Sequence, residues 1–163
     1  MLPLLLLLSL PPQPPETIHA TDDDFIRFAV AGNMAEVELA KVAVDHATDG
    51  SVKQFAQQMV ADHDKAGREI KHIADLKKIP IPTALDGEHA ALKQKLLSLK
   101  GVDFDRTFMD AMLDDHKKTV AAFRDEAQHG TDAAAKDYAK KTLPIIEMHR
   151  ARAEKIDNDL GSR

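Results

Sequence analysis

Three histidines in this sequence fall on the apolar faces of expected helices, where they could bind a metal ion. His63 and His116 each lie four residues after a methionine, and His149 lies four residues after Ile145. Because side chains four residues apart share one face of an α-helix, each imidazole should point into a helical core. Neutral imidazole binds the later first-row transition metals. The spacing therefore predicts a buried cluster able to hold one transition metal ion, either Zn, Fe, Cu or Mn.

Carboxylates accompany two of these histidines in near-copies of one phrase. Asp62 directly precedes His63, and Asp115 directly precedes His116. Adjacent residues point about 100° apart around a helix, so a carboxylate at this position does not share the face of its histidine. We therefore expect Asp62 and Asp115 to support the ligands rather than to bind the metal themselves.

The first expected helix contributes two further carboxylates. Glu38 lies three residues after Ala35 and four before Val42, at the border of the apolar stripe, whereas Glu36 should point further outward. A buried carboxylate needs a partner, because an isolated one changes its ionisation instead. We therefore expect Glu38 to be the fourth metal ligand and Glu36 to be a supporting group.

The same residues have a second interpretation that needs no metal. A histidine on an apolar face is commonly a core residue that is hydrogen-bonded to a nearby carboxylate. Glu38 and the inward histidines could satisfy one another in this way. Both interpretations are open at the level of the sequence.

Five helices are expected to position these side chains. Apolar residues recur at helical spacing in four long segments, and glycines and prolines mark the breaks between them. No segment alternates with a period of two, so we expect no strand. The expected helices cover about 22–48, 51–78, 87–99, 103–128 and 132–160, of which 87–99 is short.

The connection from 79 to 102 decides whether the candidate ligands can meet. If it crosses the whole bundle, Glu38 and the three histidines all lie about 10 to 13 residues from the same end. That spread corresponds to about 4.5 Å along the helix axis. Without the crossover, His149 would lie well away from this level. The sequence therefore predicts an all-α, ferritin-like antiparallel four-helix bundle with a short extra helix in the crossover.

The first 20 residues differ from the rest of the chain. The apolar run from Leu4 to Leu8 is followed by a proline-rich stretch, and Ala20 precedes the acidic start of the first expected helix. The run is too short to span a bilayer but suits the apolar part of a signal peptide. We predict a signal peptide or apolar, proline-rich leader at 1–20, a bundle domain at 21–163, and a periplasmic or cell-envelope location. An uncleaved leader would instead act as a weak membrane anchor.

Composition and charge exclude several classes of function. The chain has 163 residues, no cysteine and a formal net charge of -5. Without cysteine there are no disulfides, thiolate nucleophiles or iron–sulfur clusters. Nucleic acid is not an expected partner, because phosphate binding needs clustered lysine and arginine. Neither a nucleophile motif nor a glycine-rich phosphate loop is visible, so we do not expect an enzyme, and no membrane span is expected in the mature chain.

Three phrases resemble a known bacterial family. They are Asn-Met-Ala-Glu-Val-Glu-Leu at 33–39, Val-Lys-Gln-Phe-Ala-Gln-Gln-Met-Val-Ala-Asp-His at 52–63 and Lys-Thr-Leu-Pro at 141–144. They are similar to the family known as domain of unknown function 4142, whose members are often labelled as exported or outer-membrane proteins. The resemblance covers about 22–158. It implies a ferritin-like bundle, usually behind a signal peptide, and no established activity.

The sequence departs from the pattern of di-iron ferritin-like proteins. Those proteins carry Glu-x-x-His motifs, but Val60, Leu113 and Ile146 stand three residues before the inward histidines. The departure counts against ferroxidase or oxygenase chemistry and against iron storage. Two functions remain. The first is an exported bundle that binds a transition metal through its Glu/His cluster. The second is a structural or stress-related interaction module of the cell envelope, with a protein partner and no metal.

Overall fold

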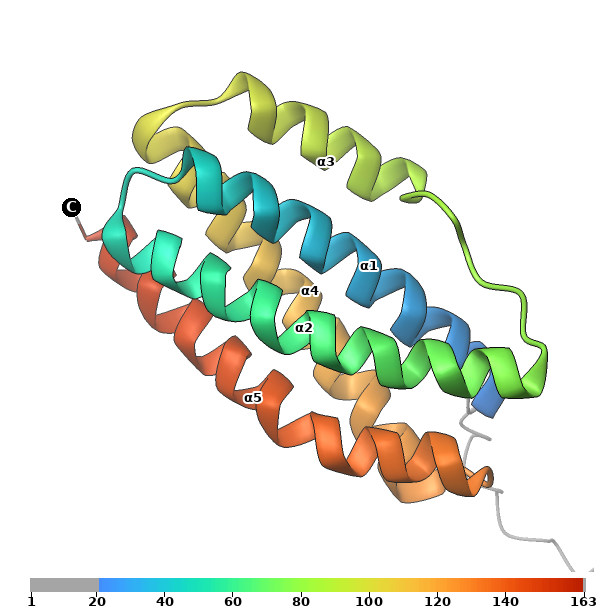
Figure 1. Cartoon of the computed structure of the whole chain (residues 1–163). Helices are drawn as coiled ribbons and strands as arrows, with labels where there is room; N and C mark the ends of the chain where they lie inside the picture. The colour runs from blue at the N-terminus through green and yellow to red at the C-terminus, as the bar shows by residue number, and fades with distance from the viewer. Residues whose placement is uncertain (1–20, 163) are drawn as a thin grey trace, which may run out of the picture.

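The computed structural model describes residues 21–162, which contain five α-helices (Figure 1). They are α1 (Asp22–His46), α2 (Gly50–Lys77), α3 (Gly87–Ser98), α4 (Gly101–His129) and α5 (Ala133–Gly161). No strand occurs among the described residues, which confirms the all-α prediction. The ends of the helices differ from the predicted ends by at most two residues.

Short polar side chains set the starts of four helices. The side chains of Thr21, Asp49, Asp86 and Asp132 each accept a hydrogen bond from a backbone N–H in the first turn of α1, α2, α3 and α5. Such caps satisfy N–H groups that have no partner within the helix. They explain why the helix starts could be read closely from the sequence.

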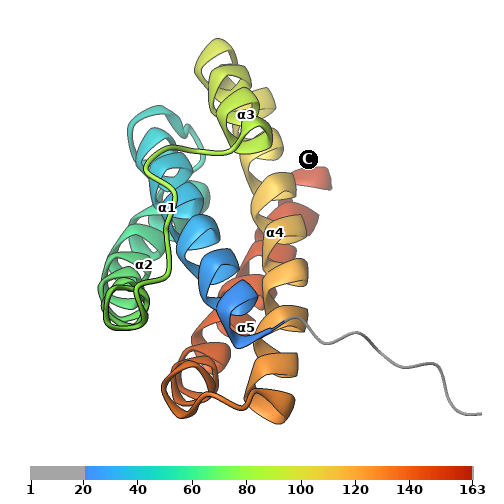
Figure 2. The same cartoon turned by 90° about the vertical axis from the view of Figure 1, so that its right-hand side faces the viewer.

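The four long helices form two hairpins joined by a crossover. Helices α1 and α2 pack along each other, as do α4 and α5. The connection between Lys77 and Gly101, which contains α3, runs back along the bundle, so that α2 and α4 begin at the same end (Figure 1). Helix α3 lies outside the long helices against α1 and α4 (Figure 2). The crossover that brings the histidines to one level is therefore present.

A buried carboxylate ties the two hairpins together at one end. Asp105 of α4 is 2% exposed. It accepts hydrogen bonds from the backbone N–H of Thr48 at 3.0 Å and of Asp49 at 2.9 Å, and from the Thr48 hydroxyl at 2.6 Å. The turn between α1 and α2 is thus held on the first turns of α4.

The core consists of two apolar clusters separated along the bundle axis by a polar layer. One cluster includes Leu39, Met59, Met112 and Ala153, and the other includes Val30, Ile70, Val120 and Ile146. On each long helix, one buried polar residue lies between the members of the two clusters. These four residues are Glu36, His63, His116 and His149.

The leader expected at 1–20 lies outside the described residues, so the division of the chain at residue 20 stays a prediction. Within residues 21–162, none of the helices combines the length and the apolar character needed to cross a bilayer.

Candidate metal centre

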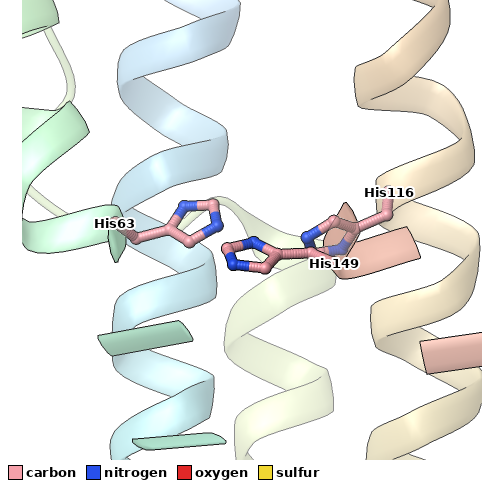
Figure 3. Close-up of side chains that lie close together, drawn as sticks. All are labelled: His63, His116 and His149. Carbon is pink, nitrogen blue, oxygen red and sulfur yellow. The ribbon is translucent and has the colours of Figure 1, made fainter. Parts of the chain in front are cut away.

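Three imidazoles from three helices meet in the polar layer of the core. His63 of α2, His116 of α4 and His149 of α5 are 7%, 0% and 1% exposed. Their rings point toward one another (Figure 3), with centroids 5.4 to 5.9 Å apart. One nitrogen from each ring can be chosen so that all three lie within 4.8 Å of one another. The predicted histidine cluster therefore exists in the fold.

In two of the rings, one nitrogen forms a hydrogen bond and the second nitrogen has no partner among the described residues. His116 Nδ1 lies 2.7 Å from the backbone oxygen of Met112. A carbonyl oxygen only accepts, so Nδ1 carries the proton and donates, and Nε2 keeps its lone pair. His149 Nε2 lies 2.9 Å from Asp62 Oδ2 and donates to that carboxylate. His116 Nε2 and His149 Nδ1 are buried and have no hydrogen-bond partner among the described residues.

The third ring is held from α1. His63 Nδ1 lies 3.2 Å from the Asn33 side-chain oxygen and 3.1 Å from Glu36 Oε2. Since an amide oxygen accepts, Nδ1 carries the proton and Nε2 is left for the cluster. Each imidazole thus uses its N–H for a fixed acceptor. This arrangement orients metal-binding histidines in proteins.

Burial keeps all three imidazoles neutral at physiological pH. It lowers the pKa of His63 to about 3, with a further contribution from the other two histidines. It lowers the pKa of His116 to about 4. Burial also lowers the pKa of His149, although the hydrogen bond to Asp62 opposes the shift. Neutral rings offer the lone pairs that a metal ion requires.

The structure reverses the predicted orientations of the two glutamates of α1. Glu36 is 3% exposed and lies against His63, and its Oε1 is 3.5 Å from His116 Nδ1. Glu38 instead points toward α3, where Lys93 donates to its Oε2 at 2.7 Å. The expectation that Glu38 faces the histidines and Glu36 faces outward is therefore wrong. Glu38 pairs with a lysine of the crossover helix, which the sequence pattern of α1 does not reveal.

Glu36 contacts the cluster without entering its set of ligand atoms. It touches the Nδ1 sides of His63 and His116, whereas the convergent group among the described residues consists of the three histidines. Burial, together with the negative charge of Asp115, raises the pKa of Glu36 to about 8. Glu36 is therefore protonated at neutral pH when no cation is nearby. Its Oε1 is buried and has no hydrogen-bond partner within residues 21–162.

The two aspartates have different surroundings. Asp62 supports a histidine, but that histidine is His149 on α5 rather than its neighbour in sequence. Burial alone would raise the pKa of Asp62, but hydrogen bonds from Gln58 and His149 hold it below its usual value. Asp115 faces away from the three rings, with its Oδ2 3.5 Å from His89 Nε2. The carboxylate that precedes each histidine thus reaches a different helix.

Sequence reasoning missed Asn33 and the close contact that places it. The side chain of Asn33 passes over Gly67 of α2, where an added Cβ would lie 2.2 Å from the Asn33 amide nitrogen. A glycine in the middle of a long helix was the available signal, because such a residue costs about 1 kcal/mol relative to alanine.

The donor set suits a late first-row transition metal. Three imidazoles with an open fourth position occur in zinc sites, and imidazole is equally suited to copper. Ligand nitrogens around a tetrahedral ion lie roughly 3.4 Å apart. The three nitrogens, which lie within 4.8 Å of one another, must turn inward to close on an ion. The two buried nitrogens that lack partners indicate that the site fits such an ion.

Comparison with protein families identifies the chain. The model of the family described as domain of unknown function (DUF4142) matches residues 8–156. The chain belongs to this family. The resemblance seen in the sequence is thereby confirmed. A comparison with curated proteins finds no match.

Solved structures of other proteins share the DUF4142 fold. A DUF305 protein from Streptomyces coelicolor, provisionally described as secreted, has a TM-score of 0.72 and 17% identity, over 86% of this chain and 94% of that one. A DUF305 fragment from Deinococcus radiodurans has a TM-score of 0.74 and 16% identity, over 92% of this chain and 100% of that one.

CopM shares the fold as well, and its structure is known in a Cu(II)-bound and in a silver-bound form. The Cu(II)-bound form has a TM-score of 0.73 and 16% identity, over 87% of the DUF4142 chain and 99% of CopM. At this level of identity the likeness concerns the fold and carries no ligand from one protein to the other.

Proposed function

We propose that this protein binds one divalent late first-row transition metal ion on His63, His116 and His149, with copper as the preferred ion. The three imidazoles supply the ligands. Asp62, Asn33 and Glu36 hold the rings in the orientation that binding requires. Glu38, the ligand expected from the sequence, is not part of the proposed set.

The observation that supports the proposal is the arrangement of the ring protons. All three rings donate their N–H to acceptors outside the cluster, so each ring keeps one nitrogen with a lone pair. The rings point toward one another, and one nitrogen of each lies within 4.8 Å of the others (Figure 3). Three lone pairs gathered in an apolar core without a donor are unfavourable, because each desolvated acceptor costs about 1–3 kcal/mol. A cation among them removes this cost.

Copper is preferred because of the ligands and of the order of metal affinities. Sites built of imidazole bind divalent ions in an order that peaks at copper, and zinc follows. The ion would supply positive charge next to Glu36 and thereby favour its carboxylate form. The solved Cu(II)-bound form of CopM, a protein of the same fold, agrees with this preference.

The remaining parts of the proposal concern where the protein works. We place the domain in the ferritin-like class of bundles, because of its two hairpins and its crossover, and in the periplasm or cell envelope, because of the leader at 1–20. There it would hold or buffer the metal rather than catalyse a reaction.

Metal analysis of the untagged protein tests the proposal. The protein is incubated with Cu²⁺ or Zn²⁺, freed of excess ion and analysed by plasma mass spectrometry. A His63→Ala/His116→Ala double variant is run beside it, with a His46→Ala/His72→Ala variant of two less buried histidines as the control. We expect about one ion per chain in the wild type and in the control, and none in the first variant.

Two further measurements distinguish the loss of metal ligands from misfolding of the variant. Thermal unfolding should shift upward with the metal in the wild type only, as expected for a ligand of the folded state. Paramagnetic resonance of the Cu²⁺ form should show coupling to imidazole nitrogens. A wild type that stays empty would overturn the proposal, and the three histidines would then be hydrogen-bonded core residues that set the helix register.

A further inference from the structure

A groove on the surface of the bundle leads toward the buried cluster. It has a volume of about 200 Å³ and lies between α1, α3 and α4. Its walls include Glu88 and His89 of α3, Asp115 and Lys118 of α4, and Glu36 of α1. Glu36 also lines a small pocket of about 30 Å³ that reaches His63. One buried carboxylate thus lies between the groove and the histidines.

His89 is oriented in this groove as metal-binding histidines are. Its Nδ1 lies 2.6 Å from Asp86 Oδ2, and the backbone N–H of His89 donates to Asp86 Oδ1 at 2.9 Å. The Asp86 carboxylate caps α3 by accepting this backbone N–H, so it is an acceptor for the ring as well. His89 Nδ1 therefore carries a proton, and Nε2 faces Asp115.

The gap between His89 and Asp115 has the width of a metal site. Nε2 and Asp115 Oδ2 are 3.5 Å apart, and both side chains are about four-fifths buried. A lone pair on Nε2 would repel the carboxylate oxygen, so this contact requires either a proton on Nε2 or a cation between the two atoms. At ordinary ligand distances of about 2.1 Å, a 3.5 Å separation gives an angle of roughly 115° at the ion, close to the tetrahedral value.

We propose that His89 and Asp115 form an outer transit site, at which the ion is captured before it passes Glu36 to the three histidines. This inference rests on the proposed function. Two protein ligands bind an ion weakly and leave its other positions to water, which suits a step of exchange. The buried Glu36 Oε1, which has no hydrogen-bond partner among the described residues, belongs to a residue that lines the same groove. Asp115 directly precedes His116 on α4, so the outer and inner ligands sit on the same helical turn.

Lys118 works against cation entry in this proposal. Its Nζ lies 3.5 Å from Asp115 Oδ1 and 4.0 Å from Glu88 Oε1, at the outer wall of the groove. The ammonium group therefore competes with an incoming ion for the same carboxylates. Removal of this charge should speed binding, and loss of His89 should slow it.

Rates of metal uptake and release test the transit site. Zn²⁺ is delivered from, and withdrawn to, a colorimetric chelator in a stopped-flow instrument. The full chain is compared with His89→Gln, with Lys118→Gln and with the control His129→Gln. His129 forms a similar pair with Asp125 at 2.9 Å but lies about 20 Å further along α4.

A substitution in a transit site changes the rates of uptake and release together. The ion occupies this site neither in the metal-free protein nor in the protein that holds it on the three histidines. We expect His89→Gln to slow both rates about fivefold or more, Lys118→Gln to raise both about twofold, and the dissociation constant to stay unchanged. Equal rates in all variants, with one ion bound, would overturn the transit site and leave the proposed function intact. A His89→Gln variant that binds the ion more weakly at equilibrium would also overturn it. A wild type without bound metal would instead overturn the proposed function.

Discussion

Ionisation of Glu36 should make the metal-free protein less stable as the pH rises. The usual pKa of a glutamate is 4.5, and burial raises that of Glu36 to about 8. Between these values the folded state holds a proton that the unfolded chain has lost. The stabilising contribution is therefore complete below pH 4.5 and is lost as the pH rises through about 8. The separation of the two pKa values corresponds to about 5 kcal/mol in total.

A Glu36→Gln variant isolates this contribution. Glutamine keeps the size of the side chain and does not titrate. We expect the free energy of unfolding of the wild type, minus that of the variant, to fall by about 2 kcal/mol from about pH 6.5 to about pH 9. The three histidines act in the opposite direction, since their lowered pKa values remove stability as the pH falls below about 6.5. They largely cancel in the difference.

Urea denaturation in the presence of a chelator, followed by circular dichroism, measures the difference. Glu126→Gln is the matched control, because desolvation and the charge of Asp22 raise the pKa of Glu126 to about 7. Most of the stabilising contribution of Glu126 is lost at lower pH. The free energy of unfolding of the wild type, minus that of Glu126→Gln, should therefore change by only about 1 kcal/mol over the same range. A difference for Glu36→Gln that stays flat with pH would refute the reasoning about its buried, protonated state.

Two further predictions concern contacts between the helices. Asp105→Ala should lower the free energy of unfolding by about 3 kcal/mol in urea denaturation, because it removes the acceptor of three hydrogen bonds at the Thr48 turn; a loss below about 1 kcal/mol would contradict this. Gly67→Ala should displace the amide of Asn33, lower the melting temperature and weaken metal binding about tenfold. Gly32→Ala, whose new Cβ meets no atom of the described residues within 4 Å, should instead stabilise the protein by about 0.5–1 kcal/mol; equal effects of the two substitutions would exclude this explanation.

The histidine cluster could be predicted because its helices have narrow apolar faces. On α2 and α4, His63 and His116 each follow a fully buried methionine by one helical turn, and both histidines are buried. Polar residues cover the other faces of these helices, so the four-residue spacing identified the inward side without ambiguity. The crossover then followed from the need to bring the rings to one level.

The glutamates of α1 could not be assigned in the same way. Helix α1 packs against α2 and α4 and is also covered by α3, so its buried residues surround much of its circumference. A hydrophobic stripe of this width has no clear border, and Glu36 and Glu38 are only two residues apart. The partner of Glu38 is Lys93, which lies 55 positions further along the chain. The position of Lys93 depends on how the crossover folds back along the bundle. Local periodicity holds no information about this.

The two apolar clusters on either side of the polar layer determine the route by which an ion can reach the three histidines. Leu39 and Met59 lie on one side of the histidines along the bundle axis, and Val30 and Ile70 lie on the other. These blocks exclude water from both ends of the bundle, so an ion would travel across the axis, between neighbouring helices. A protein that docks along a flank of the bundle, where the route between neighbouring helices opens, would then control exchange of the ion. A protein that docks on the turns at either end would leave exchange unchanged.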